Sequence, residues 1–305
     1  MYHLKRIVVS VNLIDLDEEV IRYASIVSQI MDADTIYFVH IAETLNLPEN
    51  LDKQYRDVLA PVDETIKHEV QGTVDKYFAK EKNTACSIDI LEGRPTDELI
   101  KYGKRKDADL IILGKPDEQA QKIKLGKVVE LSACSVLFVP KHADIKIEKI
   151  AVALDFSEHA KMALEQALKF AEEGRNVTIY GQHIYQVPHG YSKTGKSYEE
   201  FKTIMENNAK KDAEQFFKQY HLSENLCEMR YQLSEDAKID DELFGFAEEK
   251  DVDLLVIGSR GRTAAASILL GSVAERLLHY KNNIPLFIVK EKNSNMGFFE
   301  ALFKI

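Results

Sequence analysis

The sequence DLLVIGSRGRTAAASILLGSVAERL, residues 253 to 277, combines three features that together indicate a parallel α/β fold. The apolar run LLVI at 254–257 is uninterrupted, as is typical of a strand buried on both faces of its sheet. A loop rich in glycine and small residues follows, from Gly258 to Gly271, and a helical pattern begins near Ser272. We therefore expect a strand, a long loop at the carboxyl edge of a sheet, and a returning helix.

The chain contains such a unit twice. Segments of the first half recur in the second half in the same order, which indicates duplication of a unit of about 145 residues. The matching pairs are 5–12 with 148–155, 35–41 with 178–184, 96–114 with 239–258, and 136–141 with 285–290.

Within each copy, short apolar runs alternate with helical patterns. This alternation predicts right-handed βαβ crossovers, and hence an α/β fold of two tandem domains. Each domain is expected to be a five-stranded, mostly parallel sheet with helices on both faces. In the second copy, Ser157 is the predicted N-cap of a helix and Gly174 its predicted C-cap. The expected domains span residues 1–143 and 148–293.

Composition limits the class of protein. The chain has 305 residues, of which 45% are hydrophobic and 30% charged, as in a globular protein with buried cores. The net charge of -10 argues against nucleic acid as a partner, because phosphate backbones require clustered Lys and Arg. Three separated cysteines suggest neither a disulfide framework nor a zinc ribbon. With no signal peptide or transmembrane span apparent, we expect a cytoplasmic protein.

The glycine loop has the chemistry of an anion site. Ligands of open α/β sheets bind outside the carboxyl ends of the strands, where the strand order reverses. Glycine permits positive φ and close approach to the main chain, and a helix start offers free N–H groups. Ser272 could cap the helix or offer its hydroxyl to a phosphate. The spacing is neither GxGxxG nor GxxxxGK[ST], and the glycines could also serve only turns and a helix entry.

The loop resembles the G-x2-G-x9-G-[ST] loop of the ATP-binding branch of the universal stress protein family. LDFSEHAKMALEQAL at 154–168 resembles the family's first strand end and helix, and IPLFIVK at 284–290 resembles its last strand. The resemblance covers nearly the whole chain as two copies and is most specific in the second. It implies the fold described as adenine nucleotide alpha hydrolase-like.

The resemblance also implies a ligand and its contacts. The ligand would be ATP, with Mg²⁺ or Mn²⁺ held mainly by the phosphates and without protein metal ligands. Asp155 would face the adenosine, and Ile184 would lie in the adenine region. Arg262 could screen the phosphates or be a solvated loop charge. The residues expected around the ribose and phosphates are Gly258, Gly261, Gly271, Ser272 and Val273.

The first copy departs from this pattern. Asn12 stands in place of Asp155, and Asp117, preceded by a proline, stands in place of Gly261. The loop is one residue shorter before Gly126, and Lys127 replaces the serine. Because proline lacks an N–H group and an aspartate repels phosphate, we expect no ATP in the first domain. The lysine could still attract another anion.

Other functions are less well supported by the sequence. It contains no HExxH or GxSxG motif and no evident base beside Ser272, so we expect a regulatory ligand with at most weak ATPase activity. The alternatives are a nucleotide-independent interaction scaffold and a true ATPase. His40 and His183 occupy equivalent strand positions and are expected to be packed histidines, not metal ligands.

The tail at 294–305 is expected to be an amphipathic helix. It could dock on the protein's own surface, or contact a partner or a membrane surface. A protein partner of unknown identity and homo-oligomer formation are further expectations.

Overall fold

The computed structural model describes residues 3–46, 61–79, 84–116, 122–172, 175–236, 238–262 and 270–292. The chain forms two compact units: Ile147–Glu291 belong to one, which we call the second unit, and the residues up to Lys146, with Lys292, belong to the first. The predicted tail at 294–305 lies outside the described residues. A search of the described ranges finds no helix with the length and hydropathy of a membrane span.

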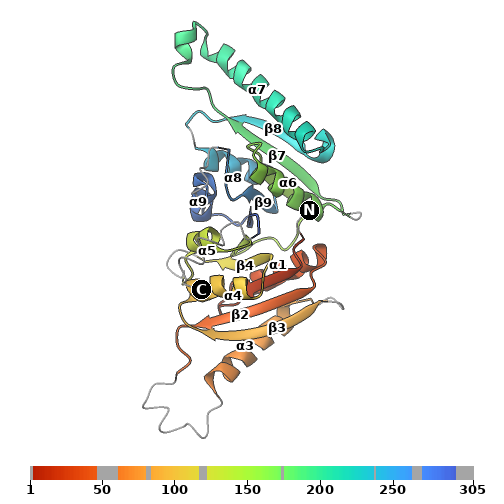
Figure 1. Cartoon of the computed structure of the whole chain (residues 1–305), viewed down its shortest axis with the longest axis vertical. Helices are drawn as coiled ribbons and strands as arrows, with labels where there is room; N and C mark the ends of the chain where they lie inside the picture. The colour runs from red at the N-terminus through yellow and green to blue at the C-terminus, as the bar shows by residue number, and fades with distance from the viewer. Residues whose placement is uncertain are drawn as a thin grey trace. The chain divides into compact units, whose positions relative to one another are not determined.

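The first unit is a parallel sheet with the strand order β3-β2-β1-β4-β5. Helix α1 packs beside α3 and helix α4 beside α5, so the two pairs cover opposite faces (Figure 1). Its elements are β1 (Arg6–Ser10), α1 (Asp17–Ile30), β2 (Thr35–Ala42), α3 (Val62–Tyr77), β3 (Ala85–Glu92), α4 (Pro95–Arg105), β4 (Leu110–Lys115), α5 (Leu125–Leu131) and β5 (Ser135–Pro140).

The second unit repeats this architecture with the order β8-β7-β6-β9-β10, again all parallel. Its elements are β6 (Lys149–Ala153), α6 (Glu158–Phe170), β7 (Thr178–Tyr185), the 3-10 turn η2 (Tyr191–Thr194), α7 (Tyr198–Gln219), the 3-10 turn η3 (Glu224–Leu226), β8 (Glu228–Leu233), α8 (Ile239–Glu249), β9 (Leu254–Gly258), α9 (Ser272–His279) and β10 (Leu286–Val289). The predicted fold of two five-stranded α/β units is confirmed.

Local signals explain several helix boundaries. Ser157 caps α6 by accepting the Ala160 N–H at 3.1 Å, as predicted. Ser197 and Glu200 form a capping box at the start of α7. The predicted C-cap at Gly174 is wrong. Helix α6 ends at Phe170, and its C-cap Ala171 stays in the right-handed region, so this end needs no glycine.

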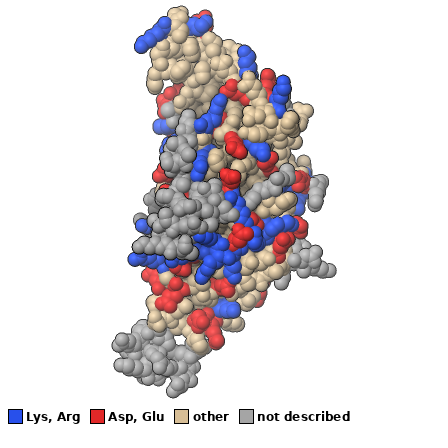
Figure 2. All heavy atoms as spheres, viewed as in Figure 1, with Lys and Arg blue, Asp and Glu red and all other residues tan. Residues whose placement is uncertain are grey.

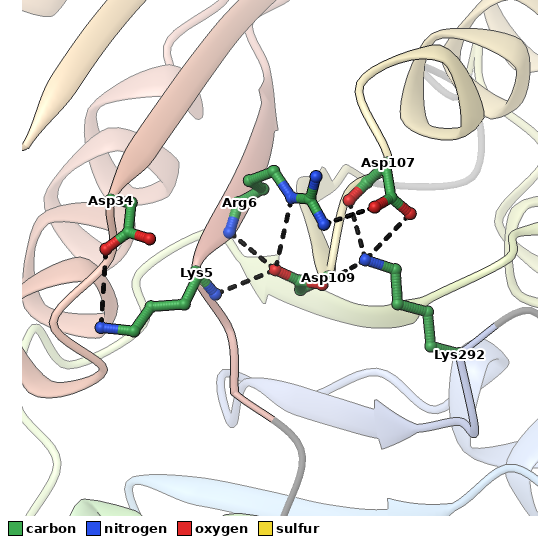
Figure 3. A network of polar contacts seen from close by, with 6 residues as sticks. All are labelled: Lys5, Arg6, Asp34, Asp107, Asp109 and Lys292. Atoms are coloured by element: carbon green, nitrogen blue, oxygen red, sulfur yellow. Dashed lines mark hydrogen bonds and ion pairs between the residues drawn. The ribbon is translucent and has the colours of Figure 1, made fainter.

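In each unit a buried aspartate accepts main-chain N–H groups at the amino edge of the sheet. Asp109, which is 4% exposed, accepts the Lys5 and Arg6 N–H groups at 3.0 and 2.8 Å. The Nζ of Lys292 lies 2.6 Å from its other oxygen (Figure 3). Asp253 likewise accepts two N–H groups, at 2.8 and 2.9 Å, where β6 begins. These contacts satisfy buried carboxylates at the edge opposite the strand ends that bind ligands in such folds.

Charges of both signs are mixed on one face of the molecule. Figure 2 shows Lys and Arg side chains lying among Asp and Glu on the face in view. One ion pair joins α5 to α4, where Lys127 lies 2.6 Å from Asp97. Another joins α9 to α8, where Arg276 lies 2.5 Å from Asp240.

Candidate functional site

The second unit brings Asp155 and the glycine loop together at the point where its strand order reverses. Strands β6 and β9 are hydrogen-bonded neighbours at the centre of the sheet. Strands β7 and β8 lie on the β6 side of this pair, and β10 lies on the β9 side, so the strand order reverses between β6 and β9. Asp155 follows the end of β6, and Gly258 is the last residue of β9. This is the position at which open parallel sheets bind ligands.

Asp155 is bonded directly to the glycine loop. Its Oδ2 accepts the Arg262 N–H at 2.7 Å, and its Oδ1 accepts the Ser157 N–H at 3.1 Å. A Cβ atom built on Gly261 would lie 2.8 Å from the same Oδ2, closer than real Cβ contacts. Gly261 therefore lets the loop backbone approach the carboxylate.

Gly258 lies where strand β9 approaches helix α6 closely. A Cβ atom there would lie 2.7 Å from both the carbonyl carbon and the oxygen of His159, in the first turn of α6. Gly258, Gly261 and Gly271 all lack positive φ, which was one of the two reasons for glycine that the sequence suggested. Close approach of helix to strand, and of loop to Asp155, explains the first two.

The two ends of the loop are closed onto each other. The Gly271 N–H donates to Ser259 O at 2.8 Å, and the Ser259 N–H donates to Val289 O at 2.9 Å. Gly271 is the N-cap of α9 without a side-chain bond, and Ser272 is its first helical residue, so Ser272 does not cap the helix. Its side chain is exposed and Val273 is half-buried. Residues 263–269 lie outside the described residues.

Helix α9 begins beside the start of the loop. The first N–H groups of a helix have no intrahelical acceptor, and the helix dipole makes this end positive. The Gly271–Ser259 bond holds that end beside the residues that precede Gly261. The arrangement can bind an anion with main-chain donors.

An aromatic stack follows Asp155 and was not anticipated. Phe156 has a φ of 62° and stacks on His183, with ring centroids 4.3 Å apart. Phe216 of α7 lies 5.6 Å from the same Phe156 ring. Ile184, the predicted adenine contact, follows His183 in β7 and is half-buried. The only sign of this stack in the sequence is the phenylalanine directly after the strand-end aspartate. An apolar residue at that position does not by itself predict an aromatic contact.

His183 is a packed histidine, as expected. Its Nδ1 lies 2.6 Å from Leu154 O, and because a carbonyl only accepts, Nδ1 carries the hydrogen. Burial lowers the pKa of His183 below its ordinary value. His40 makes the equivalent contact with Val11 O at 2.8 Å in the first unit.

The first unit differs at its corresponding edge. Asp17, which is 2% exposed, accepts the Asn12 N–H at 3.0 Å and the Ile14 N–H at 3.1 Å. Burial raises the pKa of Asp17. Lys127, which replaces Ser272, pairs with Asp97, and the predicted repelling residue Asp117 lies outside the described residues. The main-chain N–H groups at this strand end therefore already donate to the Asp17 carboxylate.

A groove of about 800 Å³ lies next to the predicted adenine region. Tyr185, the last residue of β7, lines it together with Leu233, the last residue of β8. Acidic and basic side chains line most of the rest of it, among them Arg230 and Glu242. This mixed lining specifies no ligand class by itself.

We expect the variant His183→Asn to weaken the dependence of stability on pH. The pKa of His183 is lower in the folded state than in the unfolded state. Its contribution to the free energy of unfolding is therefore complete above pH 6.5 and is lost as the pH falls toward the folded-state pKa. Each histidine contributes at most about 1.4 kcal/mol per pH unit to this slope. Urea unfolding of wild type and variant at several pH values between about 5 and 7.5 measures it. If the free energy of unfolding depended equally on pH in wild type and variant, the lowered pKa of His183 would be contradicted.

Comparison with known proteins gives a consistent result for both units. The model of the universal stress protein family matches residues 3–140 and 146–290. Universal stress protein MJ0577 of Methanocaldococcus jannaschii is 29% identical over 163 residues, which cover 49% of this chain and 99% of that protein. Universal stress protein Sll1388 of Synechocystis is 26% identical over 146 residues, covering 43% and 91%.

Solved structures resemble the whole chain. A universal stress protein from Archaeoglobus fulgidus aligns with a TM-score of 0.60 and 17% identity, covering 96% of this chain and 98% of that one. The functionally unknown protein PA1789 from Pseudomonas aeruginosa aligns with a TM-score of 0.66 and 14% identity, covering 99% and 98%. At these identities the likeness establishes the shared fold.

Proposed function

Because this chain belongs to the universal stress protein family, we propose that its second unit binds ATP as a regulatory ligand. The observation that carries the proposal is the contact between Asp155 and the glycine loop, at 2.7 Å from the Arg262 N–H. That contact lies where parallel sheets bind ligands, and a Cβ atom at Gly261 would push against the Asp155 carboxylate. A close main-chain approach of this kind suits a phosphate chain.

Each residue of the site has a proposed role. The carboxylate of Asp155 accepts a hydrogen bond from the adenosine moiety, and Ile184 packs against the base. The N–H groups at Ser272 and Val273 bind phosphate oxygens, with Gly258 and the other two loop glycines beside them. The guanidinium of Arg262 adds charge near the phosphates. A bound Mg²⁺ or Mn²⁺ would neutralise phosphate charge and would be held mainly by phosphate oxygens.

We further propose that ATP acts by ordering the loop, with at most slow hydrolysis. The residues around the loop supply donors and packing, whereas hydrolysis requires a positioned group that activates water. In this proposal the first unit is a structural partner without ATP, in the cytoplasm, and the ordered loop presents a surface to a protein partner.

Calorimetric titration with ATP and Mg²⁺ tests the proposal directly. One site per chain is expected, and nucleotide retained during purification would be released on denaturation. No heat at several temperatures, together with no released nucleotide, would contradict it and favour a nucleotide-independent scaffold.

We expect Asp155→Asn to weaken ATP binding about tenfold, because a charge-assisted hydrogen bond becomes a neutral one. The same titration measures the loss. The reverse change in the first unit, Asn12→Asp, is the control. It should leave one site per chain, because Pro116 and Asp117 remain in the loop. Undiminished binding by Asp155→Asn would exclude the proposed role of this carboxylate.

A further inference from the structure

Arg262 is held at both ends by acidic side chains. Its backbone N–H donates to Asp155, and its Nη1 lies 3.2 Å from Oδ2 of Asp212, on α7. The side chains of Arg262 and Asp212 are 52% and 40% exposed, so solvent reaches both. The positive charge that Arg262 could offer to a phosphate is therefore already shared with a carboxylate.

The position of Asp212 relative to the site is fixed by packing. Ala209, Ala213 and Phe216, on neighbouring turns of α7, are all buried. Phe216 contacts Phe156, the residue after Asp155, at 5.6 Å between ring centroids. Asp212 therefore comes from a helix that is anchored to the same strand end as the site.

We infer that Asp212 is a positioning residue that sets how strongly the site prefers nucleotides with longer phosphate chains. This inference rests on the proposed function. A phosphate chain that approaches Arg262 must compete with the Asp212 carboxylate for the guanidinium. The competition opposes binding in proportion to phosphate charge, so it penalises ATP more than AMP.

Asp212→Asn should therefore strengthen ATP binding about fivefold, the upper range for one exposed ion pair, and change AMP binding less than about twofold. The gain should shrink at high salt, because exposed charges are screened. Asp212→Glu, which retains the charge, should bind ATP like wild type. Glu214→Gln, which removes an exposed charge from the same helix, should also leave ATP binding unchanged.

The double variant Asp212→Asn with Arg262→Gln isolates the mechanism. If Asp212 acts through the guanidinium, its replacement should have little effect once Arg262 is changed. Three outcomes would each overturn this inference and leave the proposed function standing. They are equal gains for ATP and AMP, a gain in ATP binding that persists in the double variant, and unchanged ATP binding by Asp212→Asn. Failure of wild type to bind ATP would overturn the proposed function, and this inference with it.

Discussion

The variant Gly261→Asp is expected to bind ATP about 1000-fold more weakly than wild type, or not measurably. A Cβ atom at this position would lie 2.8 Å from Oδ2 of Asp155, so the new carboxylate would stand beside an existing one. The new carboxylate would face the phosphates, and like charges 4 Å apart repel by about 4 kcal/mol near a protein surface. Titration calorimetry with ATP and Mg²⁺ measures the loss, and far-ultraviolet circular dichroism checks the fold.

Two controls separate charge from shape. Gly261→Ala meets the same Oδ2, but this atom ends a flexible side chain and can move, so a loss of about tenfold is expected. Gly126→Asp makes the same chemical change in the first unit, where a Cβ atom meets nothing within 4 Å, and should leave ATP binding unchanged. Wild-type affinity in Gly261→Asp would show that ATP does not use this loop.

The sequence was sufficient for the fold because the fold depends on local patterns. Apolar runs separated by helical spacing determine strands, helices and parallel pairing, and the duplication repeats each signal. Helix starts with a serine cap, such as Ser157, were also predictable, because the cap bond forms within three residues. The end of α6 was not, since a right-handed C-cap leaves no glycine signal.

The candidate site was only partly predictable, because its contacts join distant residues. Asp155 and Gly261 were expected at one edge, but the Asp212–Arg262 pair links residues 50 positions apart and has no sequence signal. The packing of Gly258 against the His159 backbone of α6 was not predictable either, because a sequence shows a glycine without showing what approaches it.

Gly258→Ala should therefore lower the free energy of unfolding of the second unit by about 3 kcal/mol. The added methyl group would lie 2.7 Å from the His159 carbonyl group, and backbone cannot rotate away as a side chain can, so α6 must shift from the sheet. Urea unfolding measures the change.

A matched glycine in the same unit predicts the opposite sign. Gly245 lies inside α8, and a Cβ atom there meets nothing within 4 Å, so Gly245→Ala should stabilise the unit by about 1 kcal/mol. In the first unit, the atoms nearest to the new methyl group of Gly114→Ala would belong to the side chains of Leu16 and Val20, which can repack, so this variant should cost less than Gly258→Ala. If Gly258→Ala proved as harmless as Gly245→Ala, the close contact between β9 and α6 would be wrong, and with it the placement of Asp155 beside the loop.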